Sequence, residues 1–156
     1  MKALEPGSYD PVTLGHLDVI KRAAEKYDEV YAVVFINPEK KYTFSVEDRI
    51  RMLALATDGL SNVTVDFSDG YVVDYMKKRS LDLIVKGYRS EKDLAYEKIQ
   101  ADYNFSHGGY ETELLLCAEG LSEVSSTLAR ERLISGESLD EILPKKVIEY
   151  IKSEKK

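Results

Sequence analysis

The sequence predicts an α/β fold: a single doubly wound domain, residues 1–156, built on a five-stranded parallel sheet. Short apolar runs alternate along the chain with segments whose apolar residues recur at helical spacing. The run Val30–Ile36 is continuously apolar and rich in β-branched residues, as expected for a strand covered on both faces. The connections between these segments are short, which is typical of βαβ units.

The first half of the chain contains three of the expected strands and three helices. Residues 2–4 form a brief first strand, and apolar residues at helical spacing mark a helix over 15–26. Ser45, followed three residues later by Asp48, is placed to cap the second helix. The other elements expected in this half are strands over 30–36 and 62–67 and a helix over 72–79.

The second half repeats the alternation. A strand over 81–87 ends at Gly87, and a long helix follows from about Glu91 to Phe105 until Gly108 and Gly109 break it. The remaining elements are a strand over 112–117, a helix over 125–134 that stops near Gly136, and a final helix opened by Pro144.

Composition narrows the class of protein. A net charge of −6 argues against a protein that coats nucleic acid. Cys117 is the only cysteine, which excludes an internal disulfide or a cysteine metal cluster, and its apolar neighbours predict a buried strand thiol. We find no signal peptide and no apolar run of membrane length, so we expect a cytoplasmic protein without membrane contact.

Parallel sheets bind ligands at the carboxyl ends of their strands, near the point where the strand order reverses. The loops after the strands are therefore the places to look for chemistry. They span residues 6–14, 37–44, 68–71, 87–90 and 118–124.

The loop "PGSYDPVTLGH", Pro6–His16, is the most informative of these. Thr13 is placed as the N-cap of the helix that follows, and free N–H groups at a helix start attract anions. Gly7 permits a close approach of the backbone to a ligand, and Ser8 adds a hydroxyl group. The loop is neither a dinucleotide fingerprint nor a Walker loop. The alternative is an ordinary turn in which His16 is a local cap.

Three further segments have residue types suited to phosphate. Lys40 and Lys41 follow the second strand, although they also suit a solvated basic turn. Arg89 can bind phosphate oxygens through two donors. Three consecutive hydroxyl residues, Ser125–Thr127, open a helix, where hydroxyl and N–H donors suit a polyphosphate. Asp93 and Glu97 follow Arg89 at helical spacing, and the alternative for them is surface pairing with Lys92 and Lys98.

The string "TLGH", Thr13–His16, resembles the T/H-x-G-H signature of the nucleotidyltransferase superfamily. In order and over nearly the whole chain, the segments "PGSYDPVTLGH", "YTFSVEDR", "DGYVVDY", "KGYRSEKDLAYE" and "VSSTLARE" resemble the family of bacterial phosphopantetheine adenylyltransferases. This resemblance implies a Rossmann-like nucleotidyltransferase fold and transfer of the adenylyl group of ATP to 4′-phosphopantetheine. The products would be dephospho-coenzyme A and pyrophosphate. It also implies Mg²⁺ bound with ATP, without a dedicated protein metal site, and a homohexamer.

The resemblance assigns roles to residues of this sequence. It implies that His16 and Lys40 are catalytic. It implies that ATP is bound by Ser8, Tyr9, His16, Gly87, Tyr88, Arg89, Glu97, Leu121, Ser122, Glu123, Val124, Ser125, Ser126 and Thr127. The residues that it places beside the acceptor are Ser8, Lys40, Val72, Lys86, Asn104 and Glu131.

The chain departs from the family pattern at several positions. Lys86 replaces an arginine beside the acceptor, Glu5 replaces a hydrophobic or aromatic residue, and Leu121 replaces an aromatic residue near adenine. Two alternatives therefore stay open: an adenylyltransferase-like enzyme that acts on a different phosphorylated acceptor, and a nucleotide-binding module without turnover.

Overall fold

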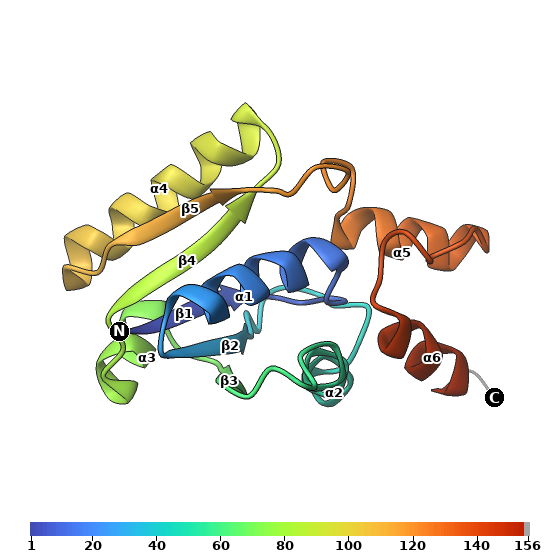
Figure 1. The fold of residues 1–156 in the computed structure, drawn as a ribbon, viewed down its shortest axis with the longest axis horizontal. Coiled ribbons are helices and arrows are strands. Elements are labelled where there is room, and N and C mark those ends of the chain that lie inside the picture. The colour runs from blue at the N-terminus through green and yellow to red at the C-terminus, as the bar shows by residue number, and fades with distance from the viewer. Residues whose placement is uncertain (155–156) are drawn as a thin grey trace.

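The computed structural model describes residues 1–154 and contains a five-stranded, fully parallel sheet with the strand order β3-β2-β1-β4-β5 (Figure 1). The strands are β1 (Lys2–Gly7), β2 (Glu29–Phe35), β3 (Val63–Ser68), β4 (Leu83–Tyr88) and β5 (Thr112–Leu116). The helices are α1 (Leu14–Lys26), α2 (Val46–Ala56), α3 (Val72–Arg79), α4 (Glu91–Gly108), α5 (Ser126–Ser135) and α6 (Lys145–Glu154). The predicted fold class is confirmed. The predicted domain also included residues 155–156, which lie outside the described residues.

Helices cover both faces of the sheet, as the apolar strands predicted. On one face, Ala32 and Val34 of β2 pack in a cluster with residues of α1, α2 and α6. On the other face, Leu4, Val33 and Ile84 pack against Tyr75 and Met76 of α3. Figure 1 shows α4 running along β4 and β5, away from α5 and α6. The strand order reverses between β1 and β4, so the switch point lies at the centre of the sheet.

The first strand is longer than predicted, because it continues past Leu4 to Gly7. Along β2 it pairs over six residues, from Lys2↔Glu29 to Gly7↔Val34. Along β4 it pairs only at Ala3↔Leu83 and Leu4↔Ile84. Proline lacks a backbone N–H, and the ladder with β4 stops before Pro6. The carboxyl ends of β1 and β4 are therefore free of mutual backbone pairing.

The helix starts agree with the capping signals in the sequence. Thr13, Ser45 and Ser125 each accept a hydrogen bond from the backbone N–H three residues later. At the other end, α4 and α5 stop at Gly109 and Gly136, whose φ angles of 75° and 81° are left-handed. Among residues 1–154, no helix combines the length and the apolar composition that crossing a bilayer requires.

The prediction for Cys117 was wrong. The strand β5 ends at Leu116, so the thiol lies in the loop that follows, and it is half-buried rather than buried. The backbone N–H of Cys117 still donates to the carbonyl of Tyr88, at 2.8 Å, which holds the start of this loop beside the end of β4.

Candidate active site

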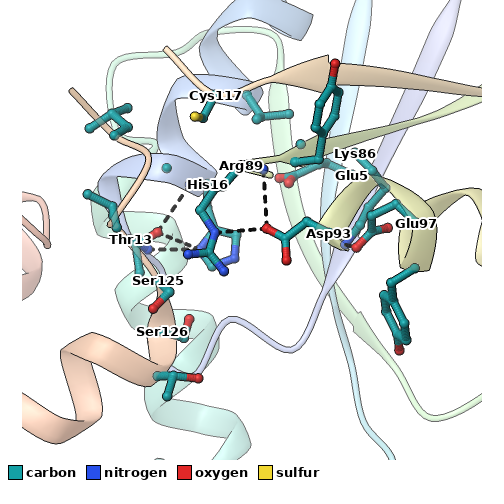
Figure 2. A pocket seen from close by; sticks show the side chains of 18 residues that line it. Glu5, Thr13, His16, Lys86, Arg89, Asp93, Glu97, Cys117, Ser125 and Ser126 are labelled. Carbon is teal, nitrogen blue, oxygen red and sulfur yellow. Dashed lines mark hydrogen bonds and ion pairs between the residues drawn. The ribbon is translucent and has the colours of Figure 1, made fainter. Parts of the chain in front are cut away.

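Three cavities that share lining residues lie at the carboxyl ends of β1 and β4. The central cavity, of about 350 Å³, is lined from β1, the start of α1, the end of β4, the first turns of α4 and the start of α5 (Figure 2). The α4-side cavity, of about 240 Å³, is lined in part by Val72 and Asn104. The Lys40-side cavity measures about 420 Å³ and contains Lys40 and Ser8. Lys86 lines all three.

His16 is both a helix cap and a cavity residue. The backbone N–H of Thr13 donates to its Nδ1 at 3.0 Å, while the N–H of His16 donates to Thr13 Oγ1 at 3.3 Å. Burial, and then the charges of Lys86 and Arg89, lower the pKa of His16 to about 3. The imidazole is therefore neutral near pH 7, and because Nδ1 accepts a hydrogen bond, the proton is on Nε2. The cap thus fixes the ring as a neutral N–H donor.

The two cations of β4 and its following loop each have an acidic partner on α4. The Nε of Arg89 lies 3.2 Å from Asp93 Oδ2, which also accepts the backbone N–H of Arg89 at 3.2 Å. Lys86 Nζ donates to the carbonyl of Pro6 at 3.0 Å and lies 4.0 Å from Glu97 Oε1. Figure 2 shows Arg89 beside His16, with Lys86, Glu5 and Glu97 on one side of the cavity.

These pairs decide between the two interpretations of Asp93 and Glu97. The alternative was that they pair across the helix surface with Lys92 and Lys98. Instead, both carboxylates turn toward the cavity and pair with Arg89 and Lys86.

The loop that carries Lys40 is tied to the loop after β1. The carboxylate of Asp10 accepts the backbone N–H groups of Thr43 and Phe44 at 2.8 and 2.9 Å. Arg49 is 2% exposed, donates to the carbonyl of Ser8 at 3.1 Å, and stacks its guanidinium 3.9 Å from the centre of the Tyr42 ring. These contacts hold the basic turn in place, so it forms a fixed part of the cavity wall.

The hydroxyl-rich start of α5 lines both the central cavity and the Lys40-side cavity. Ser126 Oγ donates to the carbonyl of Pro11 at 2.7 Å, which docks the helix start onto the loop after β1. Arg130, one turn further on, donates to the carbonyl of Asp10 at 2.8 Å and to Thr127 Oγ1 at 3.2 Å. These contacts bring hydroxyl groups and a guanidinium to the same wall as His16.

Most of the residues singled out in the sequence meet in these cavities. Those in the central cavity are His16, Lys86, Gly87, Tyr88, Arg89, Glu97, Leu121, Val124, Ser125, Ser126 and Thr127. Those in the other two are Ser8, Tyr9, Lys40, Val72 and Asn104. Ser122, Glu123 and Glu131 are exposed and line none of the three cavities. The roles of all these residues stay predictions.

Gly87 has a packing reason to be glycine. A Cβ atom at this position would lie 2.6 Å from Cγ2 of Val19 on α1. The absence of a side chain lets β4 and α1 approach closely beneath the cavity. Gly87 thereby shapes the cavity floor whether or not it contacts a ligand.

Several residues that line the cavities were not predicted from the sequence. Arg130 could have been found, because it lies three residues after Thr127 on the same helix face. Tyr96 and Cys117 carried no signal of their own, and both line the central cavity. Glu5 stood out only as a departure from the family pattern.

Glu5 is a buried carboxyl group in the wall of the central cavity. It is 2% exposed, and the Tyr9 hydroxyl donates to both its carboxylate and its backbone carbonyl. Burial raises the pKa of Glu5 to about 7, although Lys86 and the Tyr9 hydrogen bond act to lower it and Glu97 acts to raise it further.

The buried carboxyl group makes folding stability depend on pH. Because its pKa is higher in the folded state than the usual 4.5, Glu5 stabilises the fold below pH 4.5, and this contribution is lost as pH rises through about 7. Glu5→Gln is therefore expected to match wild type near pH 4.5 and to exceed its unfolding free energy at pH 8 by up to about 3 kcal/mol. Urea denaturation at both pH values measures this difference.

Glu25→Gln, on the exposed surface of α1, is the matched control and should leave the difference between the two pH values unchanged. An unfolding free energy of Glu5→Gln that follows the wild-type pH dependence would show that Glu5 titrates normally.

The fold and the site together define a class of protein. A parallel Rossmann-like sheet, a T-x-G-H loop at its switch point, and a hydroxyl-rich helix start facing that loop are the parts of a nucleotidyltransferase. The family model described as "cytidylyltransferase-like" matches residues 4–132. The chain is also 37% identical, over 150 residues, to a phosphopantetheine adenylyltransferase of Clostridium novyi (strain NT), covering 96% of this chain and 93% of the relative. The chain therefore belongs to the cytidylyltransferase-like family, and within it to the family of phosphopantetheine adenylyltransferases that its motifs resemble.

Proposed function

We propose that the chain transfers the adenylyl group of ATP to the phosphate of 4′-phosphopantetheine, which gives dephospho-coenzyme A and pyrophosphate. The reaction is a step of coenzyme A biosynthesis. The observation that carries the proposal is the junction of the three cavities, where the neutral His16 and the cations Lys86 and Arg89 face one volume. The near full-length similarity to a phosphopantetheine adenylyltransferase supports the choice of acceptor.

The chemistry rests on position and charge. The acceptor phosphate is already an anion, so its attack on the α-phosphorus of ATP requires no general base. The attacking oxygen forms a P–O bond as the bond to the pyrophosphate oxygen breaks. His16 donates its Nε2–H to the α-phosphate, and this hydrogen bond strengthens as charge develops in the transition state.

Different parts of the cavity walls bind the two reactants. Arg89 and the hydroxyls of Ser125–Thr127 hold the β- and γ-phosphates, and the adenosine lies against the end of β4 and the loop 121–124. Lys40 bridges the α-phosphate and the acceptor, and Ser8 orients both. The acceptor extends into the α4-side cavity, past Lys86 toward Val72 and Asn104.

Mg²⁺ enters with ATP in this proposal. The described residues contain no group of three or more His, Cys, Asp or Glu side chains able to hold a metal ion. Mg²⁺ is commonly held by substrate phosphates and water, so a site of cations and hydroxyls fits a metal carried by the nucleotide. The ion would neutralise charge on the triphosphate.

A homo-oligomer, with a hexamer expected from the family resemblance, is part of the proposal. None of the described residues of α4 is fully buried, and Tyr96, Ile99 and Phe105 on this helix are between 55% and 66% exposed. Leu116, at the end of the edge strand β5, is 55% exposed. A second copy of the chain is the simplest partner for this apolar edge. The expected location stays the cytoplasm.

A panel of acceptors tests the function. Pyrophosphate release is measured with ATP and 4′-phosphopantetheine, nicotinate mononucleotide, flavin mononucleotide or glycerol phosphate. The highest kcat/KM is expected with phosphopantetheine. A higher value with another acceptor would identify the enzyme as acting on a different phosphorylated acceptor. Release with none of them would indicate a nucleotide-binding module without turnover.

Lys40→Ala tests the bridge between the reactants. Because one ammonium group faces two anions, its loss is expected to lower kcat and raise the acceptor KM, with a combined effect on kcat/KM of about 10- to 100-fold. Steady-state kinetics with each substrate varied in turn measures both. Lys78→Ala, on the exposed face of α3, removes an equal charge away from the site and should change neither constant. Unchanged kinetics for Lys40→Ala would make this lysine a solvated turn residue.

A further inference from the structure

Two carboxyl groups and one ammonium group meet where the acceptor phosphate is proposed to bind. Lys86 lies 4.0 Å from Glu97, and Glu5 lines the same cavity from the neighbouring strand β1. Among residues 1–154, Glu5 has no ion-pair partner within 4.0 Å, and its one side-chain hydrogen bond comes from Tyr9. With both carboxyl groups ionised, the three side chains carry a net charge of −1.

This charge balance opposes a phosphate dianion. A phosphate that approaches Lys86 also approaches Glu5 and Glu97, and like charges in a partly desolvated site repel strongly. Glu97 has Lys86 as a direct partner, whereas Glu5 is almost fully buried without one. Protonation of Glu5 is therefore the smallest change that removes the repulsion.

We propose that Glu5 is a positioning residue that takes up a proton when the phosphate-bearing acceptor binds, so that no ionised Glu5 carboxylate opposes the pairing of Lys86 with the incoming phosphate. The proposal rests on the proposed function, because it concerns the acceptor of that reaction. An O–H bond forms on the Glu5 carboxylate, the proton comes from solvent, and no other bond changes. The neutral acid remains beside the Tyr9 hydroxyl, which can accept or donate a hydrogen bond.

Charged or titratable groups face Glu5 from the neighbouring elements. Tyr9, from the loop after β1, has a pKa raised by burial and by Glu5, so it stays protonated. His16, from α1, packs its ring 4.8 Å from that of Tyr9 and stays neutral. Lys86, from β4, lies 4.0 Å from Glu97 of α4, and burial raises the pKa of Glu97, with Lys86 acting to lower it and Asp93 to raise it further. The pKa of Glu5, near 7, allows it to change state close to neutral pH.

The consequence is a pH dependence of binding that is stronger for the acceptor than for ATP. Above about pH 7, Glu5 must be protonated at the moment of binding, so the apparent Kd for the acceptor is expected to rise, approaching tenfold per pH unit. The Kd for ATP should change less, because Arg89 and the hydroxyls of Ser125–Thr127 supply donors to the triphosphate, although Glu5 lines the same central cavity.

The test is isothermal titration calorimetry of the full-length enzyme with 4′-phosphopantetheine at about pH 7.5. Each titration is run in two buffers of different ionisation enthalpy, which gives the number of protons taken up. Wild type is expected to take up about 0.7 proton more than Glu5→Gln, because a group with a pKa near 7 is mostly ionised at this pH. The phosphate of the ligand titrates equally in both proteins and cancels in the difference.

Three further variants separate the explanations. Glu25→Gln, at an exposed position of α1, should keep the wild-type uptake. Glu5→Leu should behave as Glu5→Gln does if the carboxyl group, rather than the shape of the side chain, is responsible. Proton uptake that is lost in Glu97→Gln and kept in Glu5→Gln would overturn the inference, as would equal uptake in wild type and Glu5→Gln.

The proposed function can fail separately. If wild type releases pyrophosphate with phosphopantetheine but Glu5→Gln shows the same pH dependence of the acceptor Kd, only the inference fails. If wild type neither binds phosphopantetheine nor releases pyrophosphate with it, the proposed acceptor is wrong and the inference falls with it. A thermal melt of each variant confirms that it is folded.

Discussion

Replacing His16 with alanine is expected to lower kcat by about 10²–10³ while leaving the Kd for ATP nearly unchanged. The ring is a neutral donor, held through Nδ1 by the backbone of Thr13, and its Nε2–H is proposed to strengthen its hydrogen bond only as charge develops on the α-phosphate. Pyrophosphate release gives kcat, and calorimetry with ATP gives the Kd.

His107→Ala is the matched control, because His107 is the other histidine of the sequence and lies exposed on α4. A kcat near the wild-type value for His16→Ala would reduce His16 to a helix cap. Because the pKa of His16 is about 3, kcat should also show no histidine titration between about pH 6 and pH 8.

Lys86→Met is expected to raise the acceptor KM by about 30-fold or more, since losing one partner of a desolvated charge pair costs at least about 2 kcal/mol. The variant removes the ammonium group that lies 4.0 Å from Glu97 and whose charge lowers the pKa of Glu5, and it leaves both carboxyl groups without that cation. The KM for ATP should change little, because Arg89 and the hydroxyls of α5 remain. Steady-state kinetics with each substrate varied in turn measures both constants.

Lys86→Arg is the conservative counterpart. A guanidinium offers two parallel donors to a phosphate, so the acceptor KM is expected to fall without loss of activity. If Lys86→Met instead raised the KM for ATP and left the acceptor KM unchanged, the side chain would belong to the nucleotide side of the junction.

The fold could be predicted from local sequence patterns, because each pattern has a physical cause in neighbouring residues. The apolar run of β2 predicted a strand covered on both faces, and Thr13, Ser45 and Ser125 predicted helix starts from their own side-chain oxygens. The full length of β1 was not predicted, because Glu5 and Pro6 are not typical strand residues. Their extended backbone is imposed by pairing with Ala32 and Val33 of the next strand.

The site was predictable where a motif follows a strand and lies on one loop. His16, Arg89 and Ser125–Thr127 fit that description, and all line the central cavity. The features of the site that the sequence did not predict depend on contacts between segments that are distant along the chain. The pairing of Glu97 with Lys86 depends on how α4 lies along β4, and the burial of Glu5 depends on the packing of Tyr9 over it. Spacing along the sequence has no information on either.

The contacts that join the loop after β1 to the loop that carries Lys40 have a consequence for substrate affinity. Asp10 fixes the backbone at Thr43 and Phe44, and Arg49 joins Ser8 to the ring of Tyr42, so the segment that carries Lys40 loses its conformational entropy when the protein folds. ATP and the acceptor therefore meet a segment that is already ordered, and their binding free energy is not reduced by immobilising it. Cutting the tie at Asp10 would shift that entropy loss from folding to binding, and substrates would bind more weakly although Lys40 and Ser8 remain.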